Sequence, residues 1–231
     1  PPPPPPTPPR HGVRRQRQMC IRDRQRRARL VAREYRSEGN RDDVFAPATS
    51  PSLTRLIPIL ALQRKWSLWS LDIKDAFLLV KQREACLCKV PKEAEEVVFE
   101  DPESQRSHQC WNLGRVLPGQ RDAALLWAHF FSELLLEEGW TRSKAHPTLY
   151  RLEKKGKIVG VCSVHVDDVQ MAGKIKNIQP TLDKLSKKVK LQIEGPFLNE
   201  AEYENGFSPT SVRLLKRKYV FENHRLRVQG V

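Results

Sequence analysis

The sequence predicts an α+β fold, in which helices are interspersed with strands that are mostly joined as hairpins. Apolar residues recur at helical spacing in three stretches, residues 52–65, 122–138 and 180–190. Short apolar and β-branched stretches lie between them and are connected by turn residues, which is typical of an antiparallel sheet. The chain has 231 residues, of which 39% are apolar, so it is long enough to bury a core in one domain or in two small ones.

The charge balance favours a polyanionic partner. The chain has 41 Lys and Arg against 27 Asp and Glu, a net charge of +14, and nucleic acid is the usual partner of such a surplus. No apolar run approaches the roughly 20 residues that cross a bilayer, so we expect no membrane-spanning helix. The five cysteines are few and odd in number, which predicts a reducing compartment rather than a disulfide scaffold.

The N-terminal segment differs in composition from the rest. Residues 1–29 hold nine Arg and one Asp, and therefore +8 of the net charge. We expect residues 1–27 to be disordered, because residues 1–9 are nearly all Pro and the Arg/Gln-rich stretch after them has few apolar side chains. Residues 19–24 (MCIRDR) resemble a translated sequencing adapter, which favours an artefact of read trimming. The alternative is a basic arm that binds nucleic acid.

The first predicted element of the globular part is a helix over residues 52–65, with one apolar face. Pro58 lies inside it and has no backbone N–H, so we expect this helix to be kinked or short. Residues 66–73 have the composition of a strand, and residues 86–90 that of a second, shorter one. Residues 92–109 are polar and without a period, and we expect them to form a surface excursion.

The clearest predicted helix covers residues 122–138. Asp122 is a plausible N-cap and Gly139 stands where a glycine commonly follows a helix. Residues 157–172 are apolar on both sides of two acids, a pattern that predicts a buried hairpin with the acids at its turn. Residues 180–190 predict an amphipathic helix with lysines on its outer face.

Three acids mark a candidate active site. Asp72 lies near the end of an apolar strand, and Asp167 and Asp168 lie at the turn of the predicted hairpin. One interpretation is a solvated turn, because Asp favours turns. The other is a two-metal site, because Mg²⁺ prefers carboxylate and phosphate oxygens. Two such ions about 4 Å apart activate an attacking hydroxyl and stabilise the leaving oxygen in phosphoryl transfer.

A series of short motifs runs through the globular part in a fixed order. They are RLVAR at 29–33, FAP at 45–47, LDIKDAF at 71–77, PGQRDAALLW at 118–127, GWTRSKAHPTLY at 139–150 and VHVDDV at 164–169. In order and spacing, across residues 28–198, they resemble the reverse transcriptase region of copia-type LTR retrotransposon polyproteins. A single Val-Asp-Asp is a weak signal, whereas the whole series is a strong one.

The resemblance implies an RNA-directed DNA polymerase with a right-hand architecture. Residues 28–198 would form fingers and a palm, with an antiparallel palm sheet flanked by helices, and the thumb would be incomplete or absent. Residues 199–231 would be a divergent, truncated hairpin on the palm or thumb side, with residues 212–228 as strand, turn and strand. By position, Asp72 and Asp167 would be the principal ligands of two Mg²⁺ or Mn²⁺ ions, and Asp168 the third catalytic acid.

A nucleotide site is also implied by the resemblance. Phe77 matches the position whose ring excludes a ribose 2′-hydroxyl and so selects deoxynucleotides. Gly119 and Arg121 fall in the motif that lies along the incoming nucleotide and the template. Arg29 and Arg33 fall where basic residues of the fingers meet the triphosphate.

The implied partners are an RNA or DNA template-primer, dNTPs and the rest of the Pol polyprotein, with no membrane. By the same resemblance, the integrase and RNase H of the polyprotein would be missing from this chain. The implied location is the cytoplasm, within the element's particle, or the nucleus, and not the secretory route.

The chain departs from the family pattern in three places. His165 stands where the family usually has Tyr, residues 122–124 (DAA) replace Gln-Ala-Pro, and residues 197–200 (FLNE) replace Phe-Leu-Gly-Ile. These departures keep two alternatives open. One is a catalytically inactive remnant that at most binds nucleic acid. The other is an unrelated basic binding module with a coincidental acidic hairpin.

A zinc site is a weaker hypothesis. Cys86, Cys88, His108 and Cys110 are the residue types that bind zinc. Their one-residue spacing chelates poorly compared with Cys-x-x-Cys, so the alternative of buried or edge cysteines is favoured.

Overall fold

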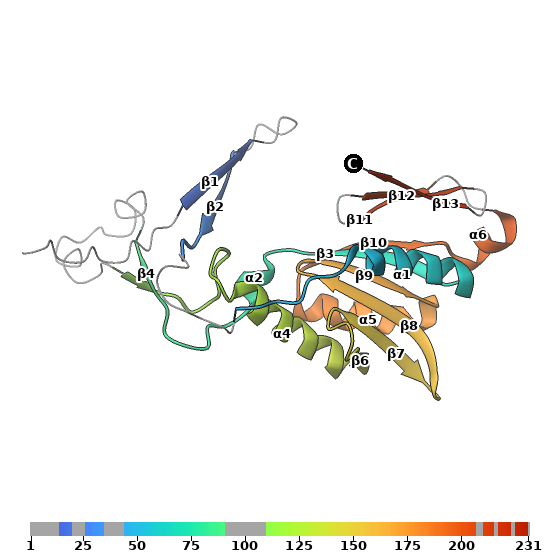
Figure 1. Cartoon of the computed structure of the whole chain (residues 1–231), viewed down its shortest axis with the longest axis horizontal. Helices are drawn as coiled ribbons and strands as arrows, with labels where there is room; N and C mark the ends of the chain where they lie inside the picture. Colours follow the sequence, from blue (N-terminus) through green and yellow to red (C-terminus); the bar gives the residue numbers. More distant parts are fainter. Residues whose placement is uncertain are drawn as a thin grey trace, which may run out of the picture. The chain divides into compact units, whose positions relative to one another are not determined.

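The computed structural model describes residues 14–19, 26–34, 44–90, 110–206, 210–214, 217–222 and 225–230. These residues fall into two compact units (Figure 1). Unit 1 comprises Pro1–Phe45 and Phe77–Leu126, and unit 2 comprises Ala46–Ala76 and Trp127–Val231. Helix α4 (Ala123–Glu137) begins in unit 1 and ends in unit 2.

Unit 2 contains a six-stranded antiparallel sheet, so the α+β class is confirmed. The strand order is β10-β3-β9-β8-β7-β6. The bounds are β3 Ser67–Ile73, β6 Trp140–Arg142, β7 Leu149–Lys154, β8 Lys157–His165, β9 Asp168–Gly173 and β10 Leu191–Phe197. The predicted strand over residues 66–73 and the predicted hairpin over residues 157–172 correspond closely to β3 and to β8 with β9.

Helix α1 (Pro51–Arg64) covers one face of this sheet. The Ser50 side chain accepts a hydrogen bond from Leu53 N, and Pro51 occupies the first turn, so the helix start is defined locally. The expectation was a kinked or short helix, and the helix is not short, because it continues past Pro58 to Arg64. Pro58 cannot donate to the carbonyl oxygen of Thr54, and the buried Tyr219 hydroxyl donates to that oxygen instead, at 3.2 Å.

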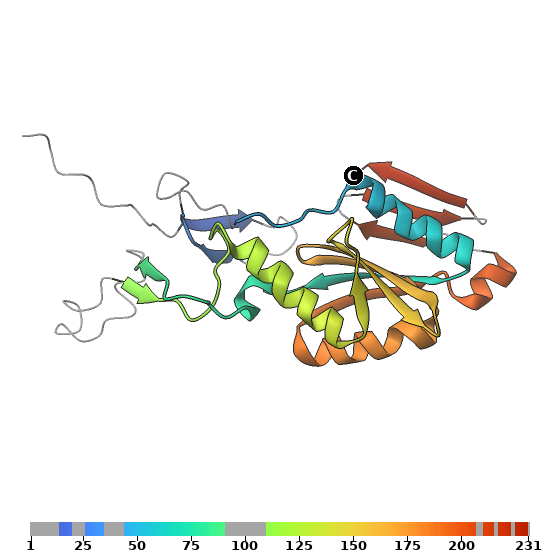
Figure 2. The ribbon, with the colours of Figure 1, turned by 60° about the horizontal axis from the view of Figure 1, so that its bottom comes forward.

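Tyr219 belongs to a second, three-stranded sheet on the same face (Figure 2). Its strands are β11 (Thr210–Leu214), β12 (Arg217–Glu222) and β13 (Arg225–Gly230). Three strands stand where the sequence predicted two, because β11 ends at Leu214 and pairs with β12, which begins at Arg217. The short helix α6 (Glu200–Asn205) precedes this sheet.

The core between α1 and the two sheets is apolar. Its buried members are Ile57, Ala61, Trp66, Leu68, Val161, Ala172, Leu198, Val212, Tyr219 and Phe221. These residues come from α1, from three strands of the large sheet and from two of the small one, and Trp66 and Leu198 adjoin strands of the large sheet. The small sheet therefore contributes to the main core rather than lying apart as a peripheral hairpin.

Helix α5 (Ile175–Lys188) packs on the opposite face of the large sheet. Gly160 and Gly173 lie opposite each other on β8 and β9, and a Cβ atom at either would come within 2.8 Å of the Ile178 side chain. The absence of side chains there lets α5 approach the sheet. The sequence pattern predicted that this helix starts at residue 180. It begins five residues earlier, because Pro180 is tolerated inside it.

Unit 1 contains shorter elements. Strand β1 (Arg14–Met19) pairs with β2 (Arg26–Val31), and β4 (Leu87–Lys89) pairs with β5 (Cys110–Asn112). Helix α2 (Ala76–Leu79) is a single turn at the boundary of the two units. The pairing of β1 differs from the disorder expected for residues 1–27, because backbone pairing does not require apolar side chains.

Some expectations fall outside the described residues. Residues 20–25 hold most of the adapter-like hexapeptide, so its artefactual origin stays a prediction, as does the surface excursion at residues 92–109. None of the described helices is both long and apolar enough to span a membrane.

Candidate active site

The three predicted acids lie together at one end of the large sheet, which we call the acidic end. Asp72 on β3 stands directly opposite Asp168 on β9. The N–H of Ile73 donates to the carbonyl oxygen of Asp167 at 3.0 Å, which makes Asp72 and Asp168 a non-hydrogen-bonded pair. Side chains of such a pair lie on the same face, with Cβ atoms about 4.5–5.5 Å apart. The strand register therefore brings two carboxylates close together.

Asp167 occupies a tight turn between β8 and β9. His165 pairs with Asp168, so only Val166 and Asp167 form the connection. Val166 has a φ of 54° in the left-handed region, which is costly for a β-branched residue. Such strain, about 1–3 kcal/mol, persists only where the surrounding structure holds the backbone in place, and it is common at functional sites.

Two further contacts hold this turn and the strand before it. The indole Nε1 of Trp127 donates to the carbonyl oxygen of Val166 at 2.7 Å. The Thr49 hydroxyl donates to the carbonyl oxygen of Val164 at 2.6 Å. Trp127 is itself fixed, since it is 1% exposed and stacks on Phe131 with ring centroids 5.4 Å apart. The backbone that carries Asp167 is thus bound on several sides.

The electrostatics of the acidic end disfavour three ionised carboxylates. Burial raises the pKa of Asp168, and the charges of Asp167 and Asp72 raise it further, while His165 lowers it. Like charges directly opposite in a sheet are destabilising. A bound cation would offset this repulsion, and divalent ions of the Mg²⁺ type bind through one or two carboxylates together with substrate phosphates and water.

A metal site made of protein side chains alone is not observed. Among the described residues, no group of three His, Cys, Asp or Glu side chains has an arrangement that would hold a metal ion. The cross-strand pair Asp72 and Asp168 still supplies the two carboxylates that a Mg²⁺ ion shared with a substrate needs. The residues present therefore fit such an ion.

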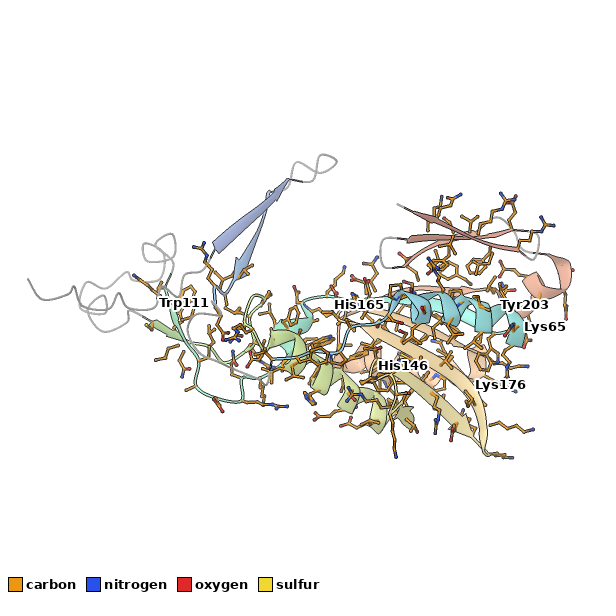
Figure 3. The ribbon with its side chains drawn as sticks, in the orientation of Figure 1. Lys65, Trp111, His146, His165, Lys176 and Tyr203 are labelled. Carbon is orange, nitrogen blue, oxygen red and sulfur yellow. The ribbon has the colours of Figure 1, made fainter. Side chains whose placement is uncertain are left out.

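Buried polar groups adjoin the acids and were not predicted from the sequence. Gln170 is 3% exposed, and neither its amide nitrogen nor its amide oxygen has a hydrogen-bond partner among the described residues. The Nδ1 atom of His165, labelled in Figure 3, is buried in the same way. The register places His165, Asp168 and Asp72 in one row of a single face, with Gln170 in the next row. The signal in the sequence was Gln170 itself, a polar residue inside the otherwise apolar β9, because a polar group in a buried strand needs a reason to be there.

The residues expected to bind the nucleotide lie in unit 1. The N–H of Ala32 donates to the carbonyl oxygen of Pro118 at 2.8 Å, and Arg121 N–H donates to the Glu34 carboxylate at 2.9 Å. Gly119 has a φ of 94°, and a Cβ there would overlap with the carbonyl oxygen of Ala32. The segment that carries the exposed Arg33 therefore lies against the segment of Gly119 and Arg121.

The other two residues expected to bind the nucleotide, Arg29 and Phe77, are located by the elements that carry them. Arg29 lies on β2, and its side chain is outside the described residues. Phe77 lies in α2 and is half-buried. Phe77 follows Asp72 by five residues along the chain, and it is the first residue of the second segment of unit 1.

The zinc hypothesis gains little from the structure. Burial raises the pKa of the Cys88 thiol, and Cys86 and Cys110 raise it further, which disfavours the thiolate that binds zinc. His108 lies outside the described residues. The interpretation of buried and edge cysteines fits Cys88, which is buried, and Cys110, which is exposed.

Comparison with known proteins gives one family and several relatives. The family described as Reverse transcriptase (RNA-dependent DNA polymerase) matches residues 7–204. The Retrovirus-related Pol polyprotein from transposon RE1 of Arabidopsis thaliana is 26% identical over 207 residues, and that from transposon TNT 1-94 of Nicotiana tabacum is 24% identical over 177 residues. These alignments cover 85% and 74% of this chain, but only 13% and 12% of the polyproteins.

Proposed function

The chain belongs to the reverse transcriptase (RNA-dependent DNA polymerase) family of copia-type retrotransposon Pol polyproteins, and from this premise we propose that its acidic end catalyses nucleotidyl transfer to a primer 3′-hydroxyl. The observation that carries the proposal is the cross-strand pair of Asp72 and Asp168 beside the turn residue Asp167. Phosphoryl transfer requires little covalent chemistry from the protein, and it depends on positioning and on charge stabilisation. Converging carboxylates on rigid strands meet that requirement.

In the proposed right-hand architecture, unit 2 is the palm and unit 1 carries the fingers. The antiparallel sheet with acids at one end and helices α4 and α5 packed beside it supports the palm assignment. Ion pairs join these helices: Lys184 lies 2.7 Å from Glu138, and Lys188 lies 2.6 Å from Glu137. A rigid sheet is the part of the molecule best suited to hold reacting groups in register.

The acids have distinct roles in the proposed reaction. Asp72 and Asp167 would be the principal ligands of two Mg²⁺ ions, or Mn²⁺ ions, and Asp168, which stands opposite Asp72, would be the third catalytic acid and a further ligand. When bound, these ions activate the 3′-hydroxyl and neutralise the charge that develops on the α-phosphate. The hydrogen bonds of Trp127 and Ile73 to the turn keep Asp167 from moving away from the site. The strained turn is thus pre-organised before substrate binds.

The nucleotide would be bound by unit 1. Arg33, Arg121 and Arg29 would attract the triphosphate, and Gly119 would let the backbone approach the base pair. Phe77 would exclude the ribose 2′-hydroxyl by contact with its ring. We expect Phe77→Val to raise ribonucleotide incorporation at least tenfold relative to deoxynucleotide incorporation, and an unchanged ratio would remove this role from Phe77.

Primer extension on an RNA template with Mg²⁺ tests the proposed function. We expect extension by the wild-type chain and none by Asp167→Asn. The matched control is Asp183→Asn, because Asp183 is an exposed acid of α5 that accepts a hydrogen bond from Gln179 in the same helix. No extension by a wild-type chain that is folded, as shown by its cooperative thermal unfolding, would contradict an active enzyme.

The alternative function is that of an inactive retroelement remnant that at most binds nucleic acid. The departure from the family at His165, next to the acidic turn, favours it. In that case the wild-type chain would bind a template-primer but would not extend it. For either function we propose the same partners, a template-primer and the rest of a Pol polyprotein, in the cytoplasm or the nucleus.

A further inference from the structure

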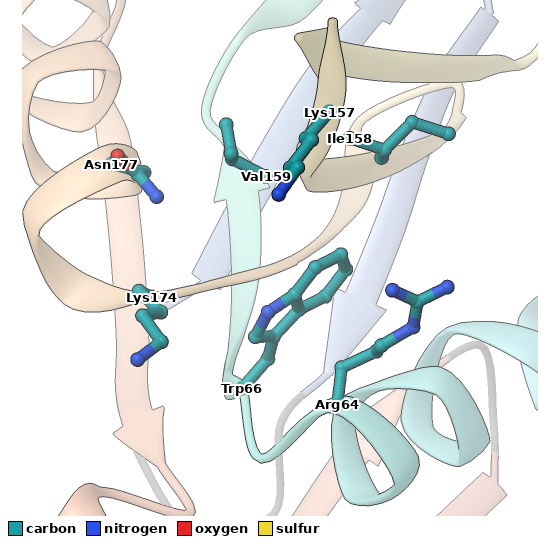
Figure 4. A pocket seen from close by; sticks show the side chains of 7 residues that line it. All are labelled: Arg64, Trp66, Lys157, Ile158, Val159, Lys174 and Asn177. Atoms are coloured by element: carbon teal, nitrogen blue, oxygen red, sulfur yellow. The ribbon is translucent and has the colours of Figure 1, made fainter. Parts of the chain in front are cut away.

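A pocket, drawn in Figure 4, includes Trp66 next to the start of β3, whereas Asp72 lies near the other end of that strand, so the pocket lies at the opposite end of the large sheet from the three acids. It has a volume of about 490 Å³. Its lining comes from the end of α1, the start of β8 and the junction of β9 with α5: Arg64, Trp66, Lys157, Ile158, Val159, Lys174 and Asn177. We call this part of unit 2 the basic end, because three of these residues are cationic and none is acidic.

The polar groups of the pocket are hydrogen-bond donors. Arg64, Lys157 and Lys174 are exposed cations. The Oδ1 atom of Asn177 accepts a hydrogen bond from Lys154 at 3.1 Å, so its NH₂ group is the part left to face a ligand. Figure 4 shows the amide nitrogen of Asn177 and the ammonium of Lys157 directed toward the space above Trp66. A lining of donors fits a ligand with several acceptor oxygens and a negative charge, which describes a phosphate group.

Within the part of the chain that the structure describes, the lining cations form no strong ion pair. Lys174 lies 3.9 Å from Glu200, and both side chains are at least half exposed, so this pair is weak. The nearby Glu153 is already paired with Arg151 at 2.7 Å. Positive potential at the basic end is therefore available to a ligand.

Cations continue beyond the pocket. Lys65 follows α1, Lys154 is the last residue of β7, Lys155 lies in the turn between β7 and β8, and Lys176 lies in the first turn of α5. Figure 3 shows Lys65 and Lys176 at the end of the sheet away from His165. A single phosphate needs only the pocket, whereas a strand with repeated phosphates would also use these outer lysines.

The distance to the acids also fits a strand. Strand β3 begins at Ser67, next to the pocket residue Trp66, and has Asp72 near its other end. Five residues of strand span about 17 Å, which corresponds to about five nucleotide steps at 3.4 Å each. One nucleic acid molecule can therefore reach both ends of the sheet.

We propose that the basic end binds the phosphate backbone of a nucleic acid strand, several nucleotides away from the catalytic acids. The identity of the strand as template or primer rests on the proposed function. Binding of the backbone does not, because it needs neither a metal ion nor catalysis.

Fluorescence anisotropy with a short labelled single-stranded DNA, in EDTA and without dNTPs, tests the proposal. The double variant Lys157→Gln with Lys174→Gln should weaken binding about tenfold at 0.1 M salt. The slope of log K against log salt should become flatter by about 1.4, because each lost contact with a single strand removes about 0.7. The matched control, Lys144→Gln with Lys187→Gln, removes two exposed cations of unit 2 outside the pocket and should change binding less than threefold.

Each outcome of this experiment supports or overturns binding of a nucleic acid strand at the basic end. An equal loss in the two double variants, or no loss in the pocket variant, would overturn the proposal, since only general charge would then matter. Displacement of the DNA by dATP at equal phosphate concentration would assign the pocket to free nucleotides instead of a strand. A wild-type chain that binds DNA through the pocket but extends no primer would contradict the proposed function and leave this inference standing.

Discussion

The acidic and basic ends of the large sheet are built from the same strands but hold their charged groups in different ways. At the acidic end, Asp72 and Asp168 lie in paired strands, and Asp167 lies in a two-residue turn bound by buried hydrogen bonds. At the basic end, Arg64, Lys157 and Lys174 are exposed side chains at a helix end, a strand start and a loop. One end holds its charges on a paired and hydrogen-bonded backbone, and the other presents them on exposed side chains.

The difference corresponds to two physical requirements. Catalysis depends on the positions of reacting atoms to within a fraction of an ångström, so its residues need a fixed backbone. Attraction of a phosphate backbone acts over several ångströms and tolerates movement of the side chain. Strands β3, β8 and β9 supply both ends, so the length of these strands fixes the separation between them.

The largest expected effect is a loss of primer-extension rate without a loss of affinity for the template-primer. Asp72→Asn should lower the primer-extension rate about a thousandfold, because about 4 kcal/mol of charge stabilisation is lost, with little change in affinity for the template-primer. Lys157→Gln with Lys174→Gln should act mainly on that affinity. Single-turnover extension at varied template-primer concentration separates the two parameters. If both variants changed the same parameter, the proposed division between the ends would be wrong.

A smaller effect should come from the bond that holds the acidic turn. Trp127→Phe removes the donor to the Val166 carbonyl oxygen and should cost about 1–1.5 kcal/mol, or about tenfold in the extension rate, with the affinity for dNTP nearly unchanged.

The control for this prediction is Trp69→Phe, which removes a buried indole from β3 rather than from the turn. Stopped-flow extension and thermal unfolding are measured for both variants. A purely structural role of Trp127 would give equal losses of rate at equal losses of stability, whereas a positioning role predicts the larger loss of rate in Trp127→Phe.

The smallest effect concerns stability. Asp168→Asn removes a carboxylate directly opposite Asp72, and at pH 7 it should raise the free energy of unfolding by about 0.5 kcal/mol. Burial and the neighbouring acids raise the folded-state pKa of Asp168 above its usual 3.8. The folded state therefore binds this proton more tightly than the unfolded state, and the resulting stability is present below pH 3.8 and lost as the pH rises through the folded-state pKa.

Urea unfolding at several pH values between 4 and 8 checks this prediction. The advantage of Asp168→Asn should be greatest at neutral pH and should shrink toward pH 4, where the wild-type carboxyl becomes protonated. A variant that is less stable than the wild type at pH 7 would show that the carboxylate makes a stabilising contact that outweighs the repulsion.

Local patterns predicted much of the fold and the existence of the acidic hairpin. Helical spacing identified α1 and α4, and Gly139, with a φ of 80°, follows α4 as expected. The two acids at the turn were predicted from their position between apolar half-strands. These signals are local in the chain, since they depend on turn residues and on side-chain periodicity.

Features that depend on distant partners were not predicted. The sequence does not reveal that Asp168, rather than Asp167, stands opposite Asp72, because the register depends on how β3 and β9 align. The bond from Trp127 to Val166 joins residues 39 positions apart. The helix predicted over residues 180–190 begins five residues earlier, at Ile175, and contains Pro180 in its interior.

The bond from Tyr219 to Thr54 has a consequence for the order of folding during synthesis. The two residues are 165 positions apart. The carbonyl oxygen of Thr54, to which Pro58 cannot donate, therefore receives its hydrogen bond only after most of the chain has been synthesised. The Thr49 bond to β8 likewise spans 115 positions. Helix α1 leaves the ribosome early, but its native partners arrive late, and contacts of such long sequence separation slow folding. The emerging chain therefore exposes the apolar face of α1, and chaperones that bind such faces would have their greatest effect on this segment.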